Sequence, residues 1–241
     1  STQAKTLFPY TTLFRSVSSG FPVVQEEKPT LRGWLHAGIL PIVIAGGVLL
    51  IVLGQGAAAK VAGSIFFASS FLLFGNSALY HRFNWKPKTK LTLKRIDHAN
   101  IFLLIAGSYT PITMLALPFE KGLYLLIAIW SMTILGIGFR VFWIGAPRWL
   151  YTLIYVGMGW GAIVYVRDFM AANLPMMVLI LAGGLAYTIG AVVYGLKRPN
   201  PFPKHFGFHE IFHSLTVLAF GCHWTAALLI CLAPLSGSFA G

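Results

Sequence analysis

The chain has 241 residues, of which 57% are hydrophobic and only 10% are charged. Soluble domains carry roughly 25% charged residues, so this composition excludes an ordinary soluble protein and favours one embedded in a membrane. The formal net charge of +12 does not indicate a nucleic-acid partner. The basic residues lie between apolar blocks, where they suit anionic lipid headgroups and cytoplasmic loops.

A polar tail, residues 1–32, precedes the first apolar block. Residues 8–16 read FPYTTLFRS, a string that resembles translated sequencing-adapter read-through. Residues 1–16 are therefore expected to be non-native and are left out of functional reasoning; the alternative is an ordinary disordered tail. Nothing in the tail has the pattern of a signal peptide.

Seven apolar blocks follow, each near the length of about 20 residues that a helix needs to cross a membrane. Pro111 lies inside the third block and is expected to kink that helix. The connections are short, so residues 33–241 are predicted to form one all-α integral membrane domain, a seven-transmembrane helix bundle. The predicted helices cover residues 34–53, 61–81, 96–117, 122–143, 149–166, 174–196 and 208–232.

The Lys and Arg residues are divided unequally between the two sides of this bundle. The tail and the connections after the second, fourth and sixth helices hold 15 of the 18 basic residues. The other side holds only Lys60, Lys121 and Arg167. Cytoplasmic loops carry the excess of basic residues. The sequence therefore predicts the N-terminus inside and the C-terminus outside.

Several ionisable residues fall near the ends of predicted helices, and such groups at membrane depth are functional candidates because burying them is costly. His81 ends the second helix, Asp97 opens the third, and the string HEIFH opens the seventh. His209 and His213 are one turn apart and point from the same face, which is a metal-binding spacing. The topology places the three histidines at one membrane level. Three protein ligands with an open position are typical of catalytic zinc, and Asp97 could bind or deprotonate its water.

Weaker signals surround this group. Glu210 stands where a soluble zinc protease has its general base, but Thr216 and Ala219 occupy the places of the Gly and His of a metzincin. A partner for Arg or Lys is the simpler interpretation of Glu210. Structural positions are expected for the other histidines: a buried hydrogen bond for His223, a structural role for His98, and interfacial places for His36 and His205.

Three motifs together resemble the hemolysin III family, which belongs with the progestin and adiponectin receptors. They are NSALYH at 76–81, RIDHANIFLLIAGSYTP at 95–111 and HEIFH at 209–213, in the family's order and spacing. The string RGWLHAGILP at 32–41 also resembles the family's start. The resemblance covers residues 32–232 and implies seven helices with the N-terminus inside.

The resemblance also implies a set of site residues. It implies Zn²⁺ held by His81, His209 and His213, with Asp97 at the position that holds the zinc-bound water. Ser77, one turn before His81, matches a family position for which a supporting role fits. The sequence matches the family at these five positions. The implied location is a bacterial inner (plasma) membrane with the zinc at its cytoplasmic side.

Two classes of function remain open. The wider superfamily includes alkaline ceramidases, so one is metal-dependent hydrolysis of a lipid amide or ester in membrane lipid homeostasis, with zinc activating water. The other is a non-enzymatic lipid sensor or regulator, or a cytolytic pore-former, with a structural zinc. In that case Asp97 could be the fourth ligand and close the coordination site. The pore has weak support, because the charged residues are confined to the helix ends. Expected partners are membrane lipids, including a lipid or fatty-acid ligand in the bundle.

Overall fold

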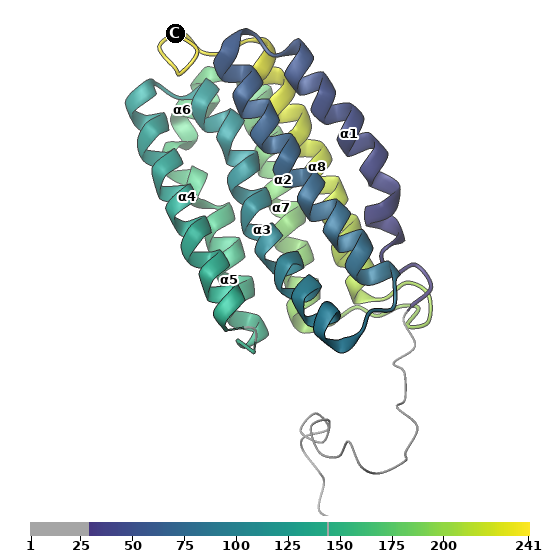
Figure 1. The fold of residues 1–241 in the computed structure, drawn as a ribbon. Coiled ribbons are helices and arrows are strands. Elements are labelled where there is room, and N and C mark those ends of the chain that lie inside the picture. Colours follow the sequence, from purple (N-terminus) through teal and green to yellow (C-terminus); the bar gives the residue numbers. More distant parts are fainter. Residues whose placement is uncertain (1–28, 144) are drawn as a thin grey trace, which may run out of the picture.

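The structure is a computed structural model that describes residues 29–143 and 145–241, and these form an all-helical bundle (Figure 1). The expectations for residues 1–16 and for most of the 1–32 tail lie outside the described residues. In chain order the elements are α1 (Trp34–Leu53), α2 (Gly56–Arg82), α3 (Pro87–Ala116), α4 (Phe119–Phe142), α5 (Arg148–Gly159), the 3-10 turn η1 (Gly161–Tyr165), α6 (Val166–Ala172), α7 (Leu174–Leu196) and α8 (Phe208–Leu232).

Seven segments of the described chain are long and apolar enough to cross a membrane. This confirms the all-α architecture and the seven apolar segments predicted from the sequence. α3 is the most enclosed, with 78% of its most apolar stretch buried, whereas the other six range from 17% to 44%. It packs against α2, α4 and α8. The outer helices leave large apolar side chains exposed, Leu135 and Val164 among them, as a surface that faces lipid requires.

The ends of α1, α7 and α8 coincide with the prediction, whereas α2 and α3 begin earlier than expected. α3 begins at Pro87 rather than at residue 96, because the apolar block marks the span and not the helix. A proline in the first turn needs no hydrogen-bond acceptor for its nitrogen, and the charged residues after it extend the helix beyond the apolar stretch. Asp97 therefore lies more than two turns inside α3. The helix continues through Pro111, and the expected kink stays a prediction.

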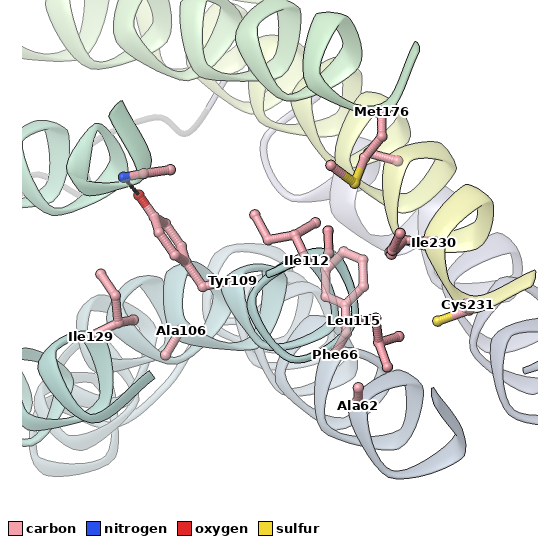
Figure 2. Packing of buried hydrophobic residues seen from close by; sticks show 14 of the residues in the cluster. Ala62, Phe66, Ala106, Tyr109, Ile112, Leu115, Ile129, Met176, Ile230 and Cys231 are labelled. Atoms are coloured by element: carbon pink, nitrogen blue, oxygen red, sulfur yellow. Dashed lines mark hydrogen bonds between the residues drawn. The ribbon is translucent and has the colours of Figure 1, made fainter. Parts of the chain in front are cut away.

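The fifth span is broken, which corrects the predicted uninterrupted helix over residues 149–166. It consists of α5, η1 and α6. Helix ends leave backbone groups without partners, and in hydrocarbon the protein itself must supply them. The Tyr109 hydroxyl does so from α3: it donates to the carbonyls of Gly159 (2.8 Å) and Met158 (3.2 Å) and accepts from the Ala162 nitrogen (2.8 Å), the bond drawn in Figure 2.

The core lies where α2, α3, α7 and α8 face one another. Phe66 of α2, Leu115 of α3 and Ile230 of α8 lie close together there, all fully or almost fully buried (Figure 2). Gly107 allows α3 to approach α2 closely, since a Cβ atom at this position would lie 1.9 Å from the Ser69 hydroxyl oxygen. Small residues at such contacts are the usual means of close helix packing in membranes. This packing holds the ends of α2, α3 and α8 beside one another.

Candidate metal centre

The polar residues singled out from the sequence gather at one end of the bundle. The helix ends that carry them lie at the lower right in Figure 1. The last turn of α2, the first turns of α8 and the start of α1 meet there, beside the third turn of α3. Two backbone bonds attach the segment before α1 to the α7–α8 connection: Thr30 donates to Lys204 (3.0 Å) and Leu31 donates to His205 (3.3 Å). Segments far apart in the chain thus enclose one small region.

Three histidines form the centre of this region. Each of His81, His209 and His213 offers one nitrogen, and these nitrogens all lie within 4.8 Å of one another, an arrangement that could hold a metal ion. The imidazole centroids are 4.7 Å apart for His81 and His209, 5.2 Å for His81 and His213, and 4.5 Å for His209 and His213. The structure therefore brings together the three residues predicted from two different helices.

The chemistry of this group fits zinc. Tetrahedral zinc holds its nitrogen ligands at about 2.0–2.1 Å, which places those nitrogens about 3.3 Å from one another. The Nε2 atom of His209 is buried and has no hydrogen-bond partner in the described part of the chain. A buried polar atom left in this state is costly, and a bound cation would remove that cost.

Asp97 and Ser77 lie beside the histidines. The Asp97 Oδ2 atom is 3.8 Å from the Nε2 atom of His81, and the side chain of Ser77 lies near the same carboxylate. Ser77 is buried, and the Asp97 side chain is 14% exposed. The carboxylate is thus close enough to act on a small molecule held by the histidines, or to join them after a short movement.

Glu210 lies among these residues but is engaged elsewhere. It is 1% exposed and forms an ion pair with Arg32, which donates through its Nε atom. Its second oxygen accepts a hydrogen bond from the Gly207 nitrogen (2.9 Å) and caps α8. Both carboxylate oxygens therefore have partners, as the simpler interpretation of this residue expected. A role for Glu210 in catalysis stays a prediction, and these contacts favour a structural one.

His36 was expected at the membrane interface, and the structure corrects this. The residue is 3% exposed, and its ring lies parallel to that of His213, with centroids 3.8 Å apart and planes inclined by 14°. The ring of Phe74 meets it edge-on at 5.0 Å. The one sequence signal for this place is the position of His36 in the RGWLH string, within the first turn of α1.

Arg140 is a second residue whose position the sequence did not reveal. It was counted with the loop residues, but it lies inside α4 and is 1% exposed. Its guanidinium group hydrogen-bonds the Nδ1 atom of His98 and lies 4.3 Å from the centroid of the Tyr151 ring. His98 therefore has the structural role expected of it. His223 also behaves as expected, with its Nε2 atom 3.3 Å from the Ile180 carbonyl oxygen.

Two hollows lie near these residues. A cleft of about 340 Å³ reaches His81 and is lined by Pro29, Thr30, Arg32, Trp34, His81 and Arg82. A smaller cavity of about 30 Å³ lies beside the break in the fifth span, with Ser108, Tyr109 and His223 in its wall. A space of that size can hold water but not a lipid chain. Of the two hollows, the cleft is the one that reaches a histidine of the group, His81.

Comparisons with known proteins agree with the sequence resemblance. The chain matches the family model described as Haemolysin-III related over residues 24–224, which include the whole candidate centre. It is 34% identical over 173 residues to the Hemolysin-3 homolog of Bacillus subtilis (strain 168), covering 71% of this chain and 78% of the relative. It is 38% identical over 197 residues to Hemolysin-3 of Bacillus cereus, covering 79% and 86%. No solved structure matches the chain.

Proposed function

The chain belongs to the haemolysin-III-related family of membrane proteins, and on that premise we propose that it binds zinc and hydrolyses an amide or ester bond of a membrane lipid. The observation that supports this most is the group of His81, His209 and His213 with the Asp97 carboxylate beside it. This donor set, with three histidines and a neighbouring base, is typical of hydrolytic zinc sites.

Each residue has a defined part in this proposal. His81, His209 and His213 would hold the ion, which when bound activates water near neutral pH and polarises the scissile carbonyl. Asp97 would orient the attacking water and accept its proton. Ser77, whose side chain lies near the Asp97 carboxylate, would help to hold that carboxylate in place. Arg32 and Glu210 hold the start of α8, and with it His209 and His213, against the segment before α1.

The proposed site lies at the cytoplasmic face of a bacterial inner membrane. The excess of Lys and Arg supports this, because 15 of the 18 basic residues lie in the tail, in the connections that share this side, or in the helix turns next to them. A C-terminal fluorescent reporter that folds only in the cytoplasm should give no signal, whereas a periplasmic phosphatase reporter should be active. The reverse pattern would invert the proposed topology.

Asp97→Asn tests the hydrolase directly, because it retains the shape of the side chain and removes the base. Purified protein in vesicles that contain ceramide or phospholipid is assayed for fatty-acid release, and zinc is measured by elemental analysis. We expect retained zinc and a loss of release of about 100-fold or more. The matched control is Asp168→Asn, which removes an exposed ion pair with Lys121 (2.6 Å); it should change neither quantity. Full activity in Asp97→Asn, or no release by the wild type from any lipid offered, contradicts the proposal.

A non-enzymatic lipid sensor or regulator with a structural zinc is the second candidate. The separation of 3.8 Å between Asp97 and His81 favours it, because a short movement would make the carboxylate the fourth ligand and close the site. Asp97→Asn should then lose zinc and thermal stability together, with no hydrolysis to lose. The same vesicles, filled with dye, also test the cytolytic activity that the names of the two Bacillus relatives suggest. Leakage without fatty-acid release would favour a pore.

A further inference from the structure

His36 is the residue of this region that the proposed function does not use. It lies within the first turn of α1, is 3% exposed, and stacks on His213 with the ring centroids 3.8 Å apart. In the described part of the chain, neither of its ring nitrogens has a hydrogen-bond partner, although both are buried. His36 thus brings two polar atoms to the edge of the three-histidine group and leaves them unsatisfied.

The packing around His36 does not explain why it is an imidazole. Phe74 meets the ring edge-on at 5.0 Å, and His213 lies flat against it. A phenylalanine ring could make both contacts without burying a polar atom. Burial of an unpartnered nitrogen costs about 1–3 kcal/mol by mutational measures, so a purely structural ring at this place would be more stable without its nitrogens. A partner from outside the chain would remove this cost.

The parallel arrangement of the two rings indicates what that partner is. His213 would hold a metal through the lone pair of a ring nitrogen, and this lone pair points along the plane of its ring. The His36 ring lies one ring thickness from this plane. The nitrogens of His36 are therefore offset from the direction of that lone pair, so they would meet a small ligand of the metal and not the metal itself.

We propose that His36 is a positioning residue of the metal centre, and that one of its ring nitrogens hydrogen-bonds the small oxygen or anion ligand that completes the coordination of the metal. The inference rests on the proposed metal site and deepens it. It assigns a fourth histidine to the centre, contributed by α1, that contacts the exogenous ligand and not the ion. The hydrogen bond selects a ligand that can accept it, such as hydroxide or a small anion.

The test replaces the metal with Co²⁺, whose visible absorption reports on its ligands, and uses azide as the probe of the exogenous position. His36→Phe retains the ring stack and removes both nitrogens. We expect the same cobalt content as the wild type, altered visible bands, and azide binding weakened about tenfold or more, the effect of losing a hydrogen bond to a charged group. His36→Gln and His36→Asn place an amide near the two nitrogen positions, and one of them should restore tight azide binding.

The matched control is His223→Gln, which changes another histidine of the bundle, ten residues beyond His213 on α8. It should leave the cobalt bands and azide affinity unchanged. Wild-type bands and azide affinity in His36→Phe overturn the proposal. Loss of cobalt from folded His36→Phe also overturns it, by making His36 a direct ligand. If wild-type protein binds neither cobalt nor zinc, the metal site itself fails, an outcome distinct from a failure of His36 alone.

Discussion

The break in the fifth span and the histidine end of the bundle face the same physical problem and meet it differently. At the break, two carbonyls and one N–H group lose their helical partners, and the single hydroxyl of Tyr109 serves all three. At the histidine end, nitrogens of His36 and His209 are buried and have no partner in the described part of the chain. The hydrogen bonds at the break are thus supplied within the described chain, whereas those of the buried histidine nitrogens are not.

This difference distinguishes polar groups that stabilise the fold from polar groups that are available to bind a ligand. Unsatisfied polar groups are expensive in a low-dielectric interior, and at the break one tyrosine removes this cost for three backbone groups. The Thr113 hydroxyl and the Trp224 Nε1 atom are also buried and have no partner in the described part of the chain. At the histidine end, however, such atoms lie in or beside a group that could hold a metal ion. Replacing a polar residue whose partners lie within the chain should therefore affect folding alone. Replacing one at the histidine end whose buried atoms have no partner within the described chain should affect the binding of a ligand.

His209→Ala should give the largest effect and the sharpest contrast. It removes a proposed ligand whose Nε2 atom has no protein partner, so zinc affinity should fall by at least about 100-fold, beyond the range seen for residues that only support a ligand. Without metal, the variant should be no less stable than the wild type. Elemental analysis measures zinc, and thermal unfolding with and without chelator measures stability. Equal zinc content in both proteins would exclude His209 from the site.

Glu210→Gln tests a residue that lies at the histidine end but has its partners within the chain. Breaking its buried ion pair with Arg32 should cost about 2–3 kcal/mol and lower the unfolding temperature whether or not metal is present. The matched control Glu120→Gln changes an exposed acid at the start of α4 and should have little effect. If Glu210→Gln instead abolished lipid hydrolysis at unchanged stability, Glu210 would be the base.

Tyr109→Phe removes the hydroxyl at the break and retains the ring. Two carbonyls and the Ala162 nitrogen then lose a partner, at a cost of about 1–3 kcal/mol. We expect a lower unfolding temperature and an unchanged zinc content. Tyr124→Phe is the control, since this tyrosine is 66% exposed on α4. A loss of zinc in Tyr109→Phe would show that the two regions are coupled and would remove the contrast between them.

Gly33→Ala should have the smallest effect. Gly33 precedes α1 with a φ angle of +82°, and a Cβ atom there would lie 3.1 Å from the backbone nitrogen of Arg82 and from the Cβ atom of His81. The strained backbone and the contact should together cost about 1–2 kcal/mol and displace His81 enough to weaken zinc binding. Gly38→Ala, in open space within α1, should be neutral or slightly stabilising. Identical behaviour of the two variants would show that Gly33 has no special role.

Local pattern accounts for the features that were predicted correctly. The length and hydropathy of each apolar block are properties of that block alone, so seven spans and the bounds of α1, α7 and α8 follow from the sequence. His209 and His213 share a face because they are one turn apart in one helix. His81 could be assigned to the same site because the order of the spans places it at the same membrane level and because it belongs to one of the family motifs. None of these inferences required the rotation of one helix against another.

Tertiary structure decided the contacts that depend on such rotations. The stacking of His36 on His213, the pair of Arg32 with Glu210, and the reach of Tyr109 to the fifth span each join residues from separate segments of the chain. A helix in lipid is apolar on its outer and inner faces alike, so hydropathy does not show which face turns inward. Shifts of a few ångströms between packed helices settle whether a histidine meets headgroups, as expected of His36, or lies against a proposed metal ligand, where the structure places it.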